Sequence, residues 1–480
     1  MSDDYTTDDL RAALARLEGE DAPRRIAEPV QADCELAAVY ARAGGGVPVA
    51  PPTRKGPPLL FERVHPGGAP VLVGLFGTRE RCAALLGCPP DRMADRLIEA
   101  ARAPVAPAAA DRAACQEQVE RGQIDLGRIP VPTMTADDAG PFLTLGLVVA
   151  RDPATGARNI SIHRMCVQGP DRVTIWMVPG RHLETFYLNA RARGQNLPVA
   201  IHIGLDPAVY LASCCTSPLA ALGCDELGIA GGLRGRPVGL APCVSQPLEC
   251  IANAEYVLEG EITDEITPES RRGGGSMPEF LGYNGRAHPG LPVVRITAVC
   301  QRRDAIFQTV IGPGYEQSNM LALGMEAGVL HFLRQNVTPR ALNAYCSSAG
   351  GGQLLLFLQM RKTSDNDDGV ARQAALAVLG AFRMIKQIVL VDEDVDVFSE
   401  EDVWWAMTTR FQADQDLTVL RNVQGFPLDP SQHPDVSPSI SSPGLTAKAI
   451  FDCTVPFRLR ARFQRSLFPW PFPEQNPKEQ

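Results

Sequence analysis

Apolar residues recur at helical spacing near the start of the chain and in uninterrupted runs after it. In residues 6–19, three leucines recur every three or four positions behind Thr7 or Asp8. This predicts an amphipathic helix capped by one of those two side chains. The apolar run at 71–77 predicts a buried strand, and 77–87 has the pattern of a helix that follows it. Two stretches rich in Gly, Pro or Ala predict a loop and a linker, at 43–58 and 103–110.

The middle of the chain changes to short β-rich runs that are separated by turn residues. They predict a β-barrel or sandwich with inserted helices. The expected strands are residues 143–152, 157–169, 172–179, 196–207 and 254–263, with a strand and hairpin at 293–312 and a helix at 181–194 that ends at Gly194.

Helices and strands alternate in the last third, which predicts a parallel or mixed sheet. The expected helices are 319–335, 370–382 and 400–412, and the expected strands are 351–362 and 386–397. The tail after about residue 425 is rich in Pro and Ser, and we expect it to wrap over a neighbour. The predicted domains are therefore 1–120, 121–315 and 316–480, in an α+β arrangement.

Composition excludes several classes of protein. With 45% hydrophobic and 21% charged residues, the 480-residue chain can build a core, and its net charge of −9 argues against nucleic-acid binding. The acidic first residues do not resemble a signal peptide, and no apolar run reaches membrane-spanning length. The 13 cysteines include no C-x-x-C pair, so zinc-ribbon and thioredoxin-type sites lack support. We expect a soluble cytoplasmic protein with reduced thiols that binds neither nucleic acid nor membrane.

Familiar nucleotide and hydrolase motifs are missing from the sequence. G-x-G-x-x-G, G-x-x-x-x-G-K-[ST] and G-x-S-x-G do not occur where a strand turns into a helix, and H-E-x-x-H is absent. Asn159, His182 and Glu226 offer an amide oxygen, an imidazole and a carboxylate, a set that suits Mn²⁺ or Mg²⁺ better than zinc. Taken alone, these residues are better explained as a turn Asn, a hydrogen-bonded His and a surface Glu.

Three charged residues are further candidates. Arg164 lies in a strand-like run, and a buried guanidinium needs an anionic partner, either a structural carboxylate or a ligand. Glu279 lies in a loop rich in Gly and Pro, where a carboxylate near an Arg can donate a proton, although a solvated loop Glu is the simpler interpretation. Lys386 begins a predicted strand and either meets a phosphate or is an ordinary strand-end Lys.

Taken together, these stretches resemble the UbiD family of reversible, non-oxidative decarboxylases. The resemblance covers almost the whole chain, and the order and spacing of its motifs are more specific than any one of them. The motifs are NISIHRM (159–165), GRHLETF (180–186) with LPVAIHIGLDPA (197–208), CDELGIAGGLRGRPV (224–238), AEYVLEGEI to SMPEFLGYNG (254–285), KQIVLVDEDVDVFSEEDVWWAMTTR (386–410), LDPS (428–431) and FDCTVP (451–456).

The resemblance implies a fold and a set of cofactors. The expected fold is a central split β-barrel, flavin-reductase-like, between N-terminal and C-terminal α/β domains. The expected cofactors are prenylated FMN, Mn²⁺ or Mg²⁺, and K⁺. Metal ligands fall on Asn159, His182 and Glu226, the arginine on Arg164 and the proton donor on Glu279. The residues expected to bind the cofactor are Asn159, Ser161, Ile162, His163, Arg164, Arg181, His182, Ser217, Pro218, Glu226 and, as a phosphate contact, Lys386.

One position departs from the family pattern. A second Glu usually stands five residues before the proton donor, where this chain has Gly274; the nearest upstream acid is Glu269. Three explanations are open: Glu269 fills the role in a rearranged loop, Arg164 and Glu279 suffice, or cofactor maturation or turnover is impaired. Because the missing carboxylate would otherwise pair with Arg164, we expect its absence to leave Arg164 less neutralised and more available to a substrate carboxylate.

The expected activity is loss of CO₂ from an α,β-unsaturated, aromatic or heteroaromatic acid. The charge left on carbon needs an electron sink that no side chain supplies, so a cofactor must provide it. A flavin prenyltransferase would supply the cofactor, and the family forms homodimers or homohexamers through the C-terminal domain. An FMN-dependent oxidoreductase and a catalytically impaired binding or assembly subunit remain alternatives.

Overall fold

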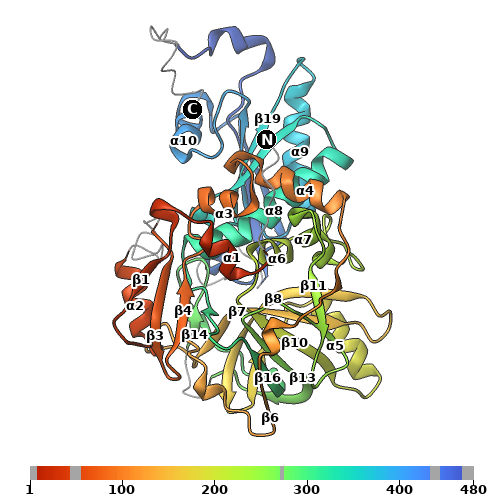
Figure 1. Ribbon diagram of the computed structural model, residues 1–480. Helices are drawn as coiled ribbons and strands as arrows, with labels where there is room; N and C mark the ends of the chain where they lie inside the picture. Colours follow the sequence, from red (N-terminus) through yellow and green to blue (C-terminus); the bar gives the residue numbers. More distant parts are fainter. Residues whose placement is uncertain (1–7, 44–55, 271–274, 433–443, 467–480) are drawn as a thin grey trace.

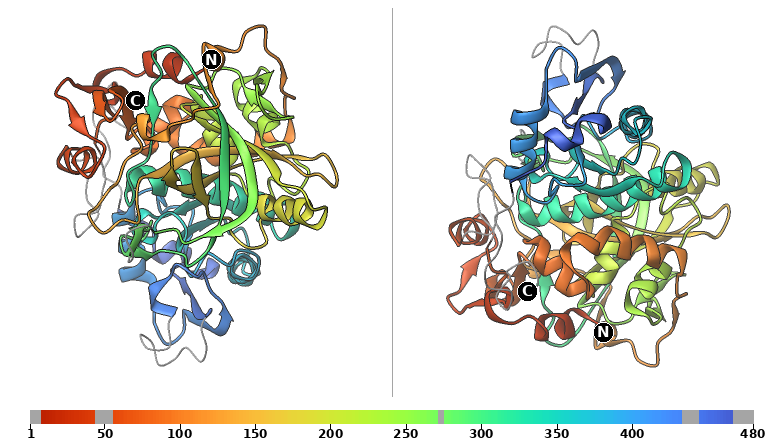
Figure 2. Two further views of the ribbon diagram at one scale, coloured as in Figure 1. Left: turned by 90° about the horizontal axis from the view of Figure 1, so that it is seen from below. Right: turned by 90° about the horizontal axis from the view of Figure 1, so that it is seen from above.

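The protein is described by a computed structural model that covers residues 8–43, 56–270, 275–432 and 444–466. Three parts follow one another along the chain and pack side by side (Figure 1; Figure 2). The N-terminal part lies along one flank of the central barrel, and the C-terminal part lies beyond one end of the barrel.

The N-terminal part is a small mixed sheet with helices. Its first helix begins behind Asp9, whose side chain accepts a hydrogen bond from the Ala12 amide, so the expected caps were placed too early: Asp8 is not the cap, and Thr7 lies outside the described residues. The strands are β1 (Arg24–Ile26), β2 (Val30–Gln31), β3 (Leu59–His65) and β4 (Ala69–Val73), and the helices are α1 (Leu10–Ala15), α2 (Glu35–Arg42), α3 (Arg79–Leu86) and α4 (Met93–Arg102).

A closed antiparallel barrel forms the centre, in the order β13-β10-β7-β8-β9-β16 with β16 pairing back to β13. Both faces of its strands are buried. Val148 and Ala150 of β7 face one core, and Leu147 and Val149 face another that is shared with the covering helices. The strands are β7 (Phe142–Arg151), β8 (Arg158–Gly169), β9 (Arg172–Ile175), β10 (Leu197–Ile203), β13 (Tyr256–Thr267) and β16 (Leu291–Gln301), and β6 (Gln118–Arg121) adds to β16.

Shorter elements surround the barrel. The helices are α5 (His182–Ala192), α6 (Pro207–Ser213) and α7 (Glu226–Arg234), and β14 (Gly275–Pro278) pairs with β15 (Asn284–Arg286) in a hairpin. The expected linker at 103–110 contains β5 (Ala108–Ala109), which joins a small sheet with β11 (Gly239–Pro242) and β12 (Glu249–Ile251). The hairpin expected at 293–312 is wrong, because β17 (Phe307–Gln308) leaves the barrel and pairs in parallel with β4.

The C-terminal part is a mixed sheet in the order β18-β19-β20-β22-β21. Part of the tail expected to wrap over a neighbour instead forms β22, an interior strand that pairs with β20 and β21. The strands are β18 (Ala341–Cys346), β19 (Leu355–Met360), β20 (Gln387–Asp392), β21 (Leu417–Gln424) and β22 (Leu445–Asp452), and the helices are α8 (Tyr315–Asn336), α9 (Asp367–Ala381) and α10 (Glu400–Arg410).

Helix α8 connects the three parts, because it packs on α4, α6 and β18. Two of its carboxylates fix it to the N-terminal part. Glu316 accepts hydrogen bonds from the amides of Gly74 at 2.8 Å and Phe76 at 3.1 Å, and Glu326 pairs with Arg79 at 2.9 Å. These hydrogen bonds and this ion pair fix the position of α8. The helix in turn forms one wall of the cavity described below.

The buried carboxyl of Glu316 should make stability depend on pH. Burial raises its pKa to about 7, although the two amides and Arg81 act in the opposite direction. Its stabilising contribution is therefore complete below about pH 4.5 and lost as the pH rises through 7. Relative to Glu316→Gln, the free energy of unfolding of the wild type should fall by about 3 kcal/mol between pH 4.5 and pH 8. Denaturant titrations of both proteins across that range test this, and a constant difference would contradict it.

Candidate active site

A cavity of about 440 Å³ lies between the barrel and the C-terminal part. It receives side chains from β8, from the first turns of α5 and α7, and from α8. The residues that the sequence predicted and that line it are Asn159, Ser161, Ile162, His163, Arg164, Arg181, His182, Ser217, Glu226 and Glu279. Most of the predicted site thus converges on one hollow, although its segments are far apart in sequence.

Arg164 is held by two carboxylates at this cavity. Its Nη1 donates to Glu279 Oε1 at 2.5 Å; Nε lies 3.1 Å from Glu269 Oε1, and Nη2 donates to Glu269 Oε2 at 3.2 Å. The side chains of Arg164 and Glu269 are 9% and 1% exposed, so solvent screens this pair little. The guanidinium also lies 5.0 Å from the centre of the Trp176 ring, which stacks on His288. Burial and the charge of Arg164 lower the pKa of His288.

Glu269 answers the question raised by the departure from the family pattern. Gly274 lies outside the described residues, but Glu269 contacts Arg164 from the end of the segment before it. The expectation that Arg164 is less neutralised is therefore wrong. Of the three explanations, the geometry favours the one in which Glu269 supplies the second carboxylate. Backbone contacts fix Glu269 as well, because the His288 amide donates to its Oε2 at 2.9 Å.

The β14–β15 hairpin presents Glu279 to Arg164. The amide of Glu279 donates to the Tyr283 carbonyl at 2.8 Å, and Gly282 in the turn has a φ of 90°, a conformation that favours glycine. Gly285 lies directly against the carboxylate, since a Cβ added there would come within 2.6 Å of Glu279 Oε1. The hairpin therefore leaves room for one carboxylate position.

A chain of hydrogen bonds along one face of β8 fixes the amide of Asn159. Nδ1 of His163 lies 3.0 Å from the Trp176 carbonyl, and Nε2 lies 2.8 Å from the Ser161 hydroxyl. Burial lowers the pKa of His163 to about 4, so the ring is neutral, with Nδ1 donating and Nε2 accepting. Ser161 in turn accepts from Asn159 Nδ2 at 3.0 Å. The Asn159 oxygen is thereby directed toward His182, whose Nδ1 lies 3.0 Å away.

Glu226 completes the three predicted metal ligands at the same cavity. It is the first residue of α7, is 3% exposed, and accepts from the Ile160 amide at 3.3 Å. Burial raises its pKa to about 8, as expected for a carboxylate that lacks a cationic partner among the described residues. No group of three or more His, Cys, Asp or Glu that could hold a metal occurs in the described segments, so the set depends on the Asn159 oxygen. One amide oxygen, one imidazole and one buried carboxylate fit Mn²⁺ or Mg²⁺.

Two predicted cofactor contacts do not line the cavity. Lys386 pairs with Asp429 at 2.7 Å and also contacts the Ser431 hydroxyl, and Pro218 follows the lining residue Ser217 without lining it. Arg383, which the sequence did not single out, lies near Arg181; burial and the charge of Arg383 lower the pKa of Arg181. Neither of these two arginines forms an ion pair within the described part of the chain, so both are available to an anion.

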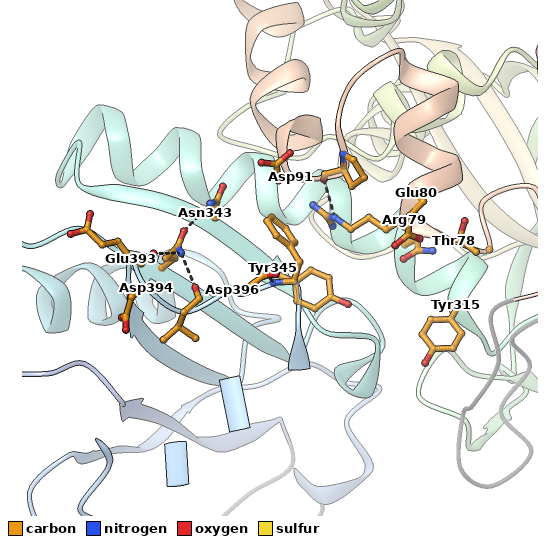
Figure 3. A pocket seen from close by; sticks show the side chains of 16 residues that line it. Thr78, Arg79, Glu80, Asp91, Tyr315, Asn343, Tyr345, Glu393, Asp394 and Asp396 are labelled. Atoms are coloured by element: carbon orange, nitrogen blue, oxygen red, sulfur yellow. Dashed lines mark hydrogen bonds between the residues drawn. The ribbon is translucent and has the colours of Figure 1, made fainter. Parts of the chain in front are cut away.

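A second hollow lies between α3 and the C-terminal sheet (Figure 3). Its volume is about 610 Å³, and its lining residues include Val395 and Phe398. Its only arginine and two of its acidic residues, Glu393 and Asp394, are already paired within the described part of the chain. Arg79 lies 2.9 Å from Glu326 and 4.5 Å above the Phe398 ring, and Asp394 pairs with Arg410 at 2.6 Å. The first cavity is therefore the better candidate for chemistry.

Family models match nearly the whole chain. The N-terminal, Rift-related and C-terminal domains of 3-octaprenyl-4-hydroxybenzoate carboxy-lyase match residues 14–101, 107–315 and 318–453. The chain belongs to the UbiD family. Membership confirms the family predicted from the sequence, the three-part fold and the assignment to the carboxy-lyases.

Several UbiD relatives are similar over their full length. Gallate decarboxylase of Lactiplantibacillus plantarum is 38% identical over 480 residues, which is 96% of each chain. The apo 3,4-dihydroxybenzoic acid decarboxylase of Enterobacter cloacae is 42% identical, with a TM-score of 0.92 over 98% of this chain and 99% of that one. The UbiD-class enzyme HmfF of Pelotomaculum thermopropionicum, solved in complex with FMN, is 36% identical, with a TM-score of 0.85 over 96% and 97% of the two chains.

Among the described residues, no helix is both long and apolar enough to cross a bilayer.

The ion pair between Arg164 and Glu269 should contribute measurably to stability. Glu269→Gln leaves the buried guanidinium with less compensation and should lower the free energy of unfolding by about 3 kcal/mol. Glu265→Gln is a matched control, because Glu265 forms an exposed pair with Arg172 and should matter by less than about 1 kcal/mol. Denaturant titrations of the three proteins make the comparison. Equal stability of the two variants would show that Glu269 is not a structural partner of Arg164.

Proposed function

We propose that this chain is a reversible, non-oxidative decarboxylase of a hydroxylated aromatic carboxylic acid, with prenylated FMN bound in the first cavity. The observation that carries the proposal is the position of Arg164 between Glu269 and Glu279. Arg164 lines the same cavity as Asn159 and His182. The choice of an aromatic acid over an α,β-unsaturated one is supported by the names of gallate decarboxylase and 3,4-dihydroxybenzoic acid decarboxylase.

The cofactor has suitable residues around it. Prenylated FMN, when bound, supplies the electron sink for the charge that CO₂ leaves on the ring carbon. One relative was solved with FMN and an evolved dimeric form of it with prFMN, which supports this choice. Asn159, His182 and Glu226 would hold Mn²⁺ or Mg²⁺, which would supply positive charge for the phosphate of the cofactor, and Arg181 and Arg383 would add to that charge. A K⁺ ion beside Ser217 and a phosphate contact of Lys386 remain predictions.

The side chains around Arg164 then have separate roles. Arg164 orients the substrate carboxylate through the N–H groups of Nη1 and Nη2 that it does not donate to Glu279 and Glu269. Glu269 holds that guanidinium in place from the buried side. Glu279 takes up a proton from solvent and delivers it to the carbon that has lost CO₂. Apolar residues of the C-terminal part, including Met320 and Phe426, keep water from this region.

A flavin prenyltransferase is the proposed supplier of the cofactor. Protein co-expressed with such an enzyme should release CO₂ from gallate or 3,4-dihydroxybenzoate and less readily from non-aromatic unsaturated acids. Protein that retains prenylated FMN yet releases no CO₂ from any acid would favour the impaired binding or assembly subunit. Rapid oxidation of NAD(P)H by the flavin-loaded protein would favour the FMN-dependent oxidoreductase.

Glu279→Gln should abolish turnover while leaving the flavin in place. The amide keeps the shape of the carboxyl group but cannot deliver a proton, so the rate of CO₂ release should fall at least about 100-fold. The flavin absorbance of the purified variant should match that of the wild type. Glu261→Gln is the control, because Glu261 contacts the exposed Asn196 rather than this cavity. Full activity of Glu279→Gln would remove Glu279 from its role.

The metal set should be tested separately from turnover. After dialysis with Mn²⁺ and removal of free ions, wild-type holoprotein should retain about one Mn²⁺ per chain, and Glu226→Gln or His182→Gln should retain much less. Glu249→Gln is a suitable control because Glu249 pairs with Arg151. Elemental analysis gives the answer, and equal retention by all four proteins would place the metal elsewhere.

A further inference from the structure

We propose that Gln353 determines specificity by hydrogen-bonding a neutral polar substituent, a ring hydroxyl, on the aromatic acid. This inference rests on the proposed function and goes beyond it, because it assigns a residue outside the motifs of the family resemblance to substrate choice. Gln353 stands in the GGGQ segment just before β19, a segment that the sequence marked as part of a strand and not as a site.

Gln353 is a largely buried residue whose side-chain amide lines the cavity without a protein partner in the described part of the chain. The residue as a whole is 7% exposed. Within the described residues its side chain makes no hydrogen bond; its backbone amide donates to the Gly350 carbonyl at 3.2 Å. A ligand that covers this amide without replacing its hydrogen bonds to water would lose about 1–3 kcal/mol. A ligand in the cavity is therefore expected to offer the amide a hydrogen bond.

The loop that carries Gln353 is built against the catalytic region. A Cβ added to Gly351 would come within 2.3 Å of the Phe280 ring, and one added to Gly352 within 2.2 Å of the Ser318 carbonyl. Both glycines have positive φ, of 63° and 75°, so other residues fit poorly there. The loop is therefore wedged between the residue that follows Glu279 and the first turns of α8. This packing fixes the backbone just before Gln353, whose side chain lines the same cavity as Glu279.

The surroundings of Gln353 select the kind of group that it can recognise. The residues that the C-terminal part adds to the cavity are otherwise mostly apolar, and none of those that line it is charged. They are Gln317, Met320, Leu321, Met325, Met384, Phe426 and Leu428. A second carboxylate or a phosphate on the substrate would find no cation among these residues, and burying it against them would be costly. A hydroxyl can both donate to and accept from an amide.

Gln317 provides a second amide on the same side. Its Oε1 is buried and has no hydrogen-bond partner among the described residues. It reaches the cavity from the first turn of α8, and Gly312 leaves space for it, since a Cβ there would lie 2.5 Å from that oxygen. Two unpaired amides in an otherwise apolar wall suit a ring that carries more than one hydroxyl. Gln353 is the more buried residue and is the one to test first.

The experiment compares aromatic acids that differ only in the number and position of their ring hydroxyls. Affinities of FMN-loaded wild type for benzoate, 3-hydroxybenzoate, 4-hydroxybenzoate and 3,4-dihydroxybenzoate are measured by calorimetry, and CO₂ release from 3,4-dihydroxybenzoate is measured with the prenylated holoenzyme. The wild type should bind at least one hydroxylated acid about 10-fold more tightly than benzoate. In Gln353→Met, which keeps the size but loses the amide, that preference should shrink to less than about 3-fold while benzoate binds as before.

Two further variants make the result specific. Met384→Leu changes the same wall without changing a polar group, so it should shift all four affinities equally. Gln353→Asn keeps an amide but shortens the side chain by one methylene, which withdraws the amide from the cavity. This variant should lose most of the preference for hydroxylated acids, and it provides the test if Gln353→Met folds poorly. An unchanged hydroxyl preference in folded Gln353→Met or Gln353→Asn overturns the role of Gln353 and leaves the proposed function standing. Failure of wild type to bind any of the four acids, together with absence of CO₂ release, overturns both.

Discussion

The site depends on keeping one guanidinium charged and oriented where little water reaches it. Arg164 lies in a barrel strand with its side chain only 9% exposed, and burying such a charge alone would be very costly. Glu269 meets this requirement from the buried side, and Glu279 does so from the cavity side. The two carboxylates are therefore not equivalent. One is fixed by backbone contacts and is almost fully buried, whereas the other stands at the end of a hairpin and faces the cavity.

The rest of the fold can be understood as support for this arrangement. The closed barrel provides strand β8, which carries Asn159, Ser161, His163 and Arg164 within six residues. Helices α5 and α7 each begin with a proposed metal ligand, so both ligands are placed by the start of a helix rather than by a free loop. Helix α8 is fixed to the N-terminal part by Glu316 and Glu326, and its other face closes the cavity with methionine and leucine side chains. Helix α8 therefore both stabilises the fold and closes the proposed substrate cavity.

Much of the fold and site could be predicted from local pattern and motif order. Strand β8, helices α5 and α9 and the convergence of Arg164 with Glu279 followed from apolar spacing and from the family resemblance. The errors share a physical cause, because they depend on pairing between distant segments. Strand β17 joins a sheet formed more than 200 residues earlier, and β22 is an interior strand in a Pro- and Ser-rich tail. Local composition contains no information about such partners.

The polar contacts that the sequence missed have a similar origin. Glu269 was considered as a replacement for the carboxylate missing at Gly274, but its ion pair with Arg164 became clear only when β13 and β8 were placed in one barrel. Lys386 lies in a matching motif, yet Asp429 from a later loop pairs with it. Gln353 carries no motif signal, because an unpaired amide is recognised by the partners it lacks in three dimensions.

The most direct test of the account follows the fate of the carbon that loses CO₂. Prenylated holoenzyme is incubated with 3,4-dihydroxybenzoate in D₂O, and CO₂, catechol and the position of deuterium are measured together. The account predicts CO₂ and catechol in equal amounts, with one deuterium on the carbon that carried the carboxylate. Loss of the acid without an equal amount of CO₂, or a product oxidised at the ring, would contradict it.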